Sequence, residues 1–206
     1  MTLYYHMKEP AVTVLGPGSR YCLWVQGCPR SCPGCVAGNT HRMEDGKQIE
    51  TGALSWEIAL SHADGLTISG GEPFLQAPAL AELIKFVRQI RPMGVIVYTG
   101  YLYEELLQMP EATEFLSQID LLIDGPYVRE LDDHKGLRGS SNQRVIPLTD
   151  VYRTVAQEYH DLSRQQQFFA HSGELHAVGL PDNDGVYNIP NLKSSEIKQT
   201  KKEFLL

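Results

Sequence analysis

Residues 21–35 of the chain read YCLWVQGCPRSCPGC, in which a short apolar run leads directly into a loop with three cysteines. The run from Tyr21 to Val25 has the length and the continuous apolar character of a buried β-strand. The loop that follows places Cys28, Cys32 and Cys35 at the spacing C-x3-C-x2-C. This unit of a strand and a polar loop is the first of several along the chain.

The three loop cysteines are candidate metal ligands. Thiolates are soft ligands that bind iron–sulfur clusters and zinc, and three of them in one loop can hold three irons of a [4Fe–4S] cubane. The alternative is zinc with His41 or Cys22 as the fourth ligand, although closed zinc sites normally use paired ligand motifs and this chain has no second pair. Because Cys22 lies inside the apolar run, we interpret it as a small buried hydrophobic residue.

A second loop of interest joins a predicted strand to a predicted helix. Residues 65–69 predict the strand, and apolar residues from Pro78 to Ile90 recur at a helical period. The loop between them contains Gly70, Gly71, Glu72 and Pro73. Glycines let backbone groups approach a ligand, and the Glu72 carboxylate suits a cationic ligand better than a phosphate. The simpler interpretation is a plain turn between a strand and a helix.

The rest of the chain continues this alternation. Further strands are predicted at residues 94–99 and 120–124, and helices at residues 54–62, 103–107 and up to 118. Apolar strands that alternate with helices are typical of a parallel sheet in an α/β domain. Ligands bind such sheets at the carboxyl ends of the strands, where this sequence has Cys28, residues 70–73, Thr99 and Asp124. We therefore expect four loops to meet at one site.

Composition excludes several classes of function. The chain has 206 residues, 42% hydrophobic and 21% charged, and a formal net charge of −7, which argues against a dedicated nucleic-acid-binding protein. No apolar run approaches the ~20 residues of a membrane-spanning helix, and residues 1–10 do not have the apolar segment of a secretion signal. All four cysteines lie between Cys22 and Cys35 rather than in a disulfide framework. We therefore expect a cytoplasmic protein without a membrane partner.

The two loops together resemble the radical S-adenosylmethionine (SAM) superfamily. The resemblance implies that Cys28, Cys32 and Cys35 hold a [4Fe–4S] cluster whose open iron is chelated by SAM. It also implies that the segment from Gly70 to Pro73 binds the methionine amino group. In this superfamily, reductive cleavage of SAM produces a 5′-deoxyadenosyl radical that abstracts a hydrogen atom. The cofactor supplies the chemistry, so no catalytic side chain is assigned.

Segments outside the cysteine loop resemble the activating enzymes of anaerobic ribonucleotide reductase. They are residues 14–20, 23–28, 98–101, 122–127 and 138–144, and the resemblance spans about Tyr4 to Leu148. It implies an incomplete (β/α)6-type barrel with a lateral opening. It further implies a protein substrate, a glycyl-radical enzyme that loses a hydrogen from a glycine Cα, and a reducing partner such as flavodoxin or ferredoxin.

Several residues have a functional and a structural interpretation. Gly34 lets a ligand approach the cysteine loop. Thr99 could hydrogen-bond SAM or satisfy a local backbone group, and Asp124 could bind the cofactor or start a turn. Arg138 and Asn142 could position the partner's glycyl loop or cap a strand end.

The last part of the chain differs in character from the first. We expect a radical SAM core at residues 1–148 and an extension at residues 149–206 with a β-hairpin, because residues 165–171 and 174–178 flank Ser172-Gly173. From Asp182 the sequence is polar, and residues 193–202 suggest a solvated tail.

Two other functions fit the same residues. One is a radical SAM enzyme that modifies a ribosomally made peptide. The other is an iron–sulfur electron carrier or a zinc protein without SAM chemistry, which the intact Glu72 segment opposes.

Overall fold

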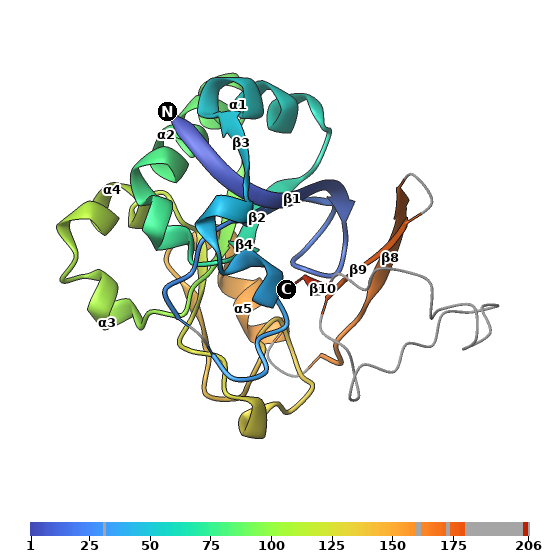
Figure 1. Ribbon diagram of the computed structural model, residues 1–206. Helices are drawn as coiled ribbons and strands as arrows, with labels where there is room; N and C mark the ends of the chain where they lie inside the picture. The colour runs from blue at the N-terminus through green and yellow to red at the C-terminus, as the bar shows by residue number, and fades with distance from the viewer. Residues whose placement is uncertain (31, 160–161, 172–173, 180–203, 206) are drawn as a thin grey trace.

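The computed structural model describes residues 1–30, 32–159, 162–171, 174–179 and 204–205 (Figure 1). The expected polar segment from Asp182 and the tail at residues 193–202 lie outside this described part. Within it, no helix is both long and apolar enough to cross a lipid bilayer.

A seven-stranded mixed sheet forms the centre of the protein, with the strand order β3-β1-β2-β4-β5-β6-β7. The strands are β1 (Thr2–Val12), β2 (Arg20–Val25), β3 (Lys47–Glu50), β4 (Gly65–Gly70), β5 (Gly94–Tyr98), β6 (Leu121–Asp124) and β7 (Arg144–Pro147). The four central strands β2, β4, β5 and β6 run parallel, as their apolar sequences predict. The expected α/β class is therefore confirmed.

Three strands of the sheet escaped prediction from the sequence. Strand β1 pairs antiparallel with β2, β3 pairs antiparallel with β1, and β7 pairs antiparallel with β6. They lie on the two sides of the parallel strands, where one strand face is partly exposed and polar residues are tolerated. Such strands do not show the continuous apolar run by which the parallel strands were recognised.

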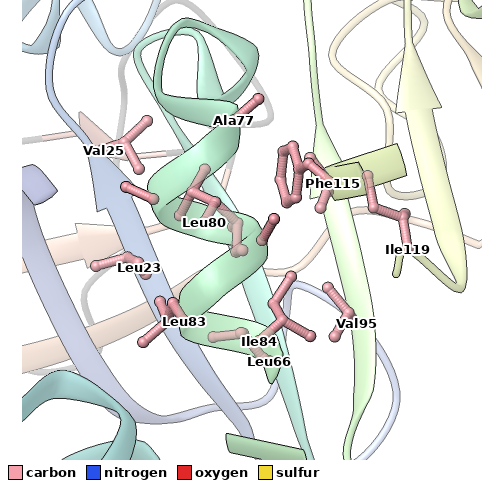
Figure 2. Packing of buried hydrophobic residues seen from close by; sticks show 14 of the residues in the cluster. Leu23, Val25, Leu66, Ala77, Leu80, Leu83, Ile84, Val95, Phe115 and Ile119 are labelled. Atoms are coloured by element: carbon pink, nitrogen blue, oxygen red, sulfur yellow. The ribbon is translucent and has the colours of Figure 1, made fainter. Parts of the chain in front are cut away.

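The helices α1 (Thr51–Leu60), α2 (Ala77–Ile90) and α4 (Thr113–Leu116) cover one face of the sheet. Figure 2 shows Leu80, Leu83 and Ile84 of α2 packed above Leu23 and the neighbouring strands. Side chains alternate between the two faces of a strand, so every second residue of β2, β4 and β5 joins this core. The short helix α3 (Tyr103–Leu106) follows β5. The predicted helices at residues 54–62, 78–90 and 103–107 are thus present with slightly different ends.

The C-terminal extension covers the opposite face of the sheet. Tyr152, which caps helix α5 (Arg153–Glu158), joins Ala156 of α5 and Val178 of strand β9 (Glu174–Val178) in a second apolar cluster with Trp24 and Ile96. The expected hairpin is present as β8 (Gln167–His171) and β9, and β10 (Phe204–Leu205) adds a parallel strand beside β9. In Figure 1 the hairpin stands on the side of β1 and β2 away from α1 and α2. The extension therefore packs against the sheet rather than lying apart from it.

Short 3-10 helices complete the fold. They are η1 (Gly38–Thr40), η2 (Met43–Asp45), η3 (Pro73–Gln76), η4 (Pro110–Ala112), η5 (Arg129–Leu131) and η6 (Asp150–Tyr152). Two of them matter for the site because η1 follows the cysteine loop and η3 begins directly after Glu72.

A buried arginine joins the extension to the sheet. Arg20 is 1% exposed and donates to the Tyr152 hydroxyl at 2.6 Å and to the Leu66 carbonyl at 2.7 Å. Position 94 is glycine because a Cβ there would lie 2.3 Å from the Tyr152 hydroxyl oxygen. These contacts fix the start of α5 against the amino-terminal ends of the parallel strands.

We expect Tyr152→Phe to destabilise the protein by ~1.5–3 kcal/mol, because the change leaves a buried guanidinium N–H of Arg20 without its acceptor. Urea unfolding of the apoprotein followed by circular dichroism measures this loss. Val151→Ala, at a neighbouring exposed position, is the control and should change the free energy of unfolding by less than about 0.5 kcal/mol. Equal effects of the two substitutions would contradict a specific role of the Arg20–Tyr152 hydrogen bond.

Candidate active site

One pocket collects the loops that follow the four parallel strands. Its lining comes from the segment after β2 (Cys28, Arg30, Cys32, Cys35, Val36, Ala37, His41), the end of β4 (Ser69, Gly70, Gly71, Glu72), the end of β5 (Tyr98, Thr99, Gly100) and the segment after β6 (Gly125, Tyr127, Gln143). The prediction that these loops meet at one site is therefore confirmed. The pocket lies on the carboxyl ends of the strands, where parallel α/β sheets bind their ligands.

The cysteine loop is folded by its own backbone. The Cys35 N–H donates to the Cys32 carbonyl at 3.1 Å, and the Cys28 N–H donates to the His41 carbonyl at 2.9 Å. Gly34 has a φ of +73°, a left-handed conformation that favours glycine, so it serves the sharp turn of the loop. Cys28, Cys32 and Cys35 all line the same pocket.

The three thiols fit the requirements of a cubane cluster. Burial raises the pKa of Cys28 to about 11 and that of Cys35 above its ordinary value, and the nearby Cys32 thiol raises both pKa values further. A cubane holds each thiolate on a different iron, so its ligands do not converge on one point. Among the described residues, no group of three or more His, Cys, Asp or Glu side chains is arranged around a single metal ion.

Cys22 lies apart from this group. It is 1% exposed, belongs to β2 and packs in the apolar cluster between the sheet and the extension. It does not line the pocket, whereas His41, the other alternative zinc ligand, does. The interpretation of Cys22 as a buried small residue agrees with this position.

The two glycines after β4 allow close backbone packing against the cysteine segment. A Cβ at Gly71 would lie 2.2 Å from the Gly27 carbonyl oxygen, and one at Gly70 would lie 2.6 Å from the Val25 carbonyl oxygen. The Gly71 N–H donates to Val25 at 2.9 Å, and the Glu72 N–H donates to Gly27 at 2.8 Å. The glycines therefore bring the two loops together, a reason beyond the ligand approach inferred from the sequence.

Glu72 is a buried carboxylate held by three donors. Its Oε1 accepts from the Thr99 hydroxyl at 2.8 Å and from the Phe74 N–H at 3.1 Å, and its Oε2 accepts from the Gly100 N–H at 2.9 Å. The side chain is 1% exposed, and burial raises its pKa although these hydrogen bonds act in the opposite direction. Glu72 caps η3 before Pro73, as expected of a turn between a strand and a helix, and it also lines the pocket, as expected of a ligand-binding residue.

Thr99 and Asp124 occupy different positions. Thr99 lines the pocket, donates to Glu72 and accepts from the Tyr101 N–H at 3.1 Å. Asp124 is fully buried and binds Arg144, and its Oδ2 accepts from the Tyr103 N–H at 2.7 Å. Asp124 itself does not line the pocket, whereas the next residue, Gly125, does.

The sequence analysis missed several residues of the pocket lining, among them Arg30, Tyr127 and Gln143. Arg30 packs its guanidinium 4.4 Å from the centre of the Tyr101 ring, and so joins the cysteine loop to the segment after β5. Tyr127 and Gln143 come from segments whose sequence resemblance was noted without a role for these side chains. The sequence gives no local signal for the contact between Arg30 and Tyr101, because only the fold brings these two residues together.

Arg138 and Asn142 lie near the pocket without lining it. The Arg138 side chain pairs with Asp133 at 2.5 Å, and the Asn142 amide donates to the Pro126 carbonyl at 2.8 Å. The structure thus shows both in local contacts that hold the segments around Gln143.

Comparison with known proteins identifies the family. The family described as a 4Fe-4S single cluster domain matches residues 14–146. The anaerobic ribonucleoside-triphosphate reductase-activating protein of Escherichia coli (strain K12) is 36% identical over 154 residues, which cover 68% of this chain and 96% of that protein. The chain belongs to this family of 4Fe-4S activating proteins. It is a radical SAM enzyme of the glycyl-radical activating type, and its cofactors are a [4Fe–4S] cluster and SAM.

Two further relatives delimit the similarity. The activating protein with the same name from Enterobacteria phage T4 is 33% identical over 152 residues, covering 71% of this chain and 95% of its own. The pyruvate formate-lyase-activating enzyme of Staphylococcus epidermidis is 36% identical over 89 residues, but these cover only 36% of that enzyme. The reductase-activating relatives therefore match nearly end to end, and about a third of this chain lies outside their alignment.

We expect anaerobically reconstituted protein to contain about four irons and four sulfides per chain, and alanine at Cys28, Cys32 or Cys35 to abolish this content. Cys22→Ala is the matched control and should retain the cluster, since Cys22 is buried away from the pocket. Iron and sulfide analysis with visible absorption of the four variants measures the outcome. Loss of the cluster in Cys22→Ala alone, or one zinc ion in place of iron, would contradict the assignment.

The raised pKa of Glu72 predicts a pH dependence of stability. A carboxyl group whose pKa is higher in the folded state stabilises the fold fully below its unfolded value of 4.5, and this contribution is lost as the pH rises through the raised pKa. Between about pH 5 and pH 7 the free energy of unfolding of the apoprotein should therefore fall more in wild type than in Glu72→Gln. Urea unfolding at both pH values tests this, with exposed Glu111→Gln as control. Parallel pH profiles of wild type and Glu72→Gln would contradict a raised pKa.

Proposed function

We propose that this protein activates an anaerobic ribonucleotide reductase by removing a hydrogen atom from a glycine Cα of that enzyme. The observation that carries this proposal is the match to reductase-activating proteins over nearly their whole length. The alignments cover 95–96% of those relatives. The match to a pyruvate formate-lyase-activating enzyme covers a much smaller share of that relative. The reductase is therefore the partner that the comparisons favour.

The chain supplies the residues that hold and orient the cofactors. Cys28, Cys32 and Cys35 would hold the cluster, while Gly34 permits the turn that lets them share one pocket. When bound, the cluster and SAM supply a one-electron reductive cleavage whose net products are methionine, 5′-deoxyadenosine and a glycyl radical on the partner. The electron comes from a low-potential donor such as flavodoxin or ferredoxin, and the hydrogen comes from the glycine.

Residues 70–73 would bind the methionine part of SAM. The Glu72 carboxylate is buried and fixed by its donors from Thr99, Gly100 and Phe74, so it is already oriented before a cation arrives. A positive ammonium group in the pocket would offset the cost of burying this charge. Pro73 starts η3 and keeps Glu72 at the helix cap. Thr99 then orients Glu72, and Asp124 holds the segment from which Gly125 faces the pocket.

We further propose that the central sheet is the wall of an incomplete radical SAM barrel made of residues 1–148, and that residues 149–206 are an extension added to this core. The parallel strands β2, β4, β5 and β6 have the order of consecutive β/α units, and all cofactor residues lie at their carboxyl ends. A partial barrel leaves a side open, through which a protein loop could reach the cofactor. Location in the cytoplasm stays a prediction from the sequence.

The direct test uses electron paramagnetic resonance. The reconstituted protein is incubated without oxygen with SAM, a one-electron reductant and an anaerobic ribonucleotide reductase from the same organism. We expect a glycyl-radical signal on the reductase that is absent with Cys32→Ala. SAM cleavage without any radical on the reductase would contradict the proposed partner and favour a peptide substrate.

We expect Glu72→Gln to weaken SAM binding by roughly ten- to a hundredfold, since a charged hydrogen bond contributes ~1.5–3 kcal/mol and each ~1.4 kcal/mol changes affinity tenfold. The cluster should remain, because Glu72 is not one of the thiol ligands. Anaerobic SAM titration, with iron measured on the same sample, checks both points, and Glu111→Gln serves again as the exposed control. Unchanged affinity at full iron content would reject contact between Glu72 and SAM.

A further inference from the structure

Arg164 of the extension is buried against a segment that lines the pocket. Its side chain is 3% exposed, and its NH2 group donates to the carbonyls of Arg138 and Gly139 at 2.8 and 2.7 Å. Its NH1 group pairs with Asp132 at 2.7 Å. One guanidinium therefore holds two consecutive carbonyls and a carboxylate, a geometry that the planar fork of arginine allows and a lysine ammonium does not.

The backbone around Arg164 is also tied to the core. The Gly136 N–H donates to the Leu162 carbonyl at 2.7 Å, and Lys135 forms an antiparallel bridge with Ser163. The matched family segment ends at residue 146, so Arg164 lies outside it, in the extension. Whatever Arg164 does for the site is thus a property of the extension.

The segment held by Arg164 is held on its other side by Gln143. The Gln143 side-chain oxygen accepts from the Gly139 N–H at 2.7 Å and from the Ser140 N–H at 3.2 Å. Arg164 donates to the carbonyls of Arg138 and Gly139, and Gln143 accepts from the N–H groups of Gly139 and Ser140. The peptide groups 138–139 and 139–140 are thus each hydrogen-bonded at the carbonyl by Arg164 and at the N–H by Gln143. Hydrogen bonds at both ends of a peptide group polarise it and strengthen one another, so the two side chains are coupled.

Gln143 connects the segment held by Arg164 to the pocket wall. Its side-chain amide donates to the Gly125 carbonyl at 2.7 Å, and the Ser140 hydroxyl accepts from the Val128 N–H at 3.1 Å. Gly125, Tyr127 and Gln143 all line the pocket. A continuous series of hydrogen bonds therefore runs from Arg164 in the extension to the pocket wall after β6.

We propose that Arg164 is a positioning residue of the SAM site, by which the extension holds the Arg138–Gln143 segment and so the pocket wall in its binding geometry. The inference rests on the proposed SAM site and goes beyond it, because it gives the extension a part in cofactor affinity. Arg164 acts through Gln143 and touches neither the cysteine loop nor Glu72.

The test compares SAM affinity of reconstituted Arg164→Lys and wild type. Lysine keeps the charge beside Asp132 but loses the fork, so we expect about tenfold weaker SAM binding at unchanged iron content. Tyr152→Phe is the matched control, because it weakens the extension at Arg20 without touching the Arg138–Gln143 segment. It should leave SAM affinity within about twofold of wild type, as distant sites act independently.

A double-mutant cycle tests the route through Gln143. Gln143→Ala should also weaken SAM binding. The SAM affinity of the double variant should be close to that of whichever single variant binds SAM less tightly, since both substitutions release the same two peptide groups around Gly139. Strictly additive effects would overturn the coupling. Unchanged affinity in Arg164→Lys, or an equal loss in Tyr152→Phe, would overturn the positioning role.

Hydrogen exchange of the wild-type protein gives a test that needs no variant. SAM added to the cluster-loaded protein should slow amide exchange in residues 138–143 and also in residues 162–167. Protection of the first segment without the second would overturn the inference while leaving the SAM site intact. A full cluster that binds no SAM at all would overturn both this inference and the proposed function.

Discussion

The site depends on the close contact between the backbone after β2 and the backbone after β4. Gly71 lies so near Gly27 that no side chain fits between them, and the N–H groups of Gly71 and Glu72 donate to the carbonyls of Val25 and Gly27. The segment that begins the cysteine loop and the segment that carries Glu72 are therefore one hydrogen-bonded unit. Any larger residue at position 71 would move Glu72 away from the thiols that share its pocket.

The second feature is a charge kept out of water. Glu72 has three donors, from η3, Thr99 and Gly100, yet burial still raises its pKa, so the ionised carboxylate is not fully compensated by the protein alone. A cationic ligand would supply the missing compensation. Such a cost in stability is common at binding sites, where residues are arranged to bind a ligand rather than to stabilise the free protein.

The extension covers the face of the sheet opposite to the helices α1, α2 and α4. Tyr152 reaches the amino-terminal ends of the strands through buried Arg20, and Arg164 reaches the segment beside the carboxyl ends. Helix α5 and β9 fill the space between these two anchors with apolar side chains. A segment outside the matched part of the chain thus contacts both ends of the sheet.

The sequence by itself determined the parallel strands, their helices, the cysteine loop and the Glu72 segment, because each of these depends on residues close together in the chain. Apolar runs and short spacings are local signals that survive without any knowledge of packing. It did not reveal β1, β3 and β7, whose partly exposed faces blur the apolar pattern, nor the contacts of Asp124 with Arg144 and Tyr103. Only the tertiary structure brought Arg30 onto Tyr101 and Arg164 onto the Gly139 carbonyl, since these partners are distant in sequence and a buried arginine cannot be told from an exposed one in a linear chain.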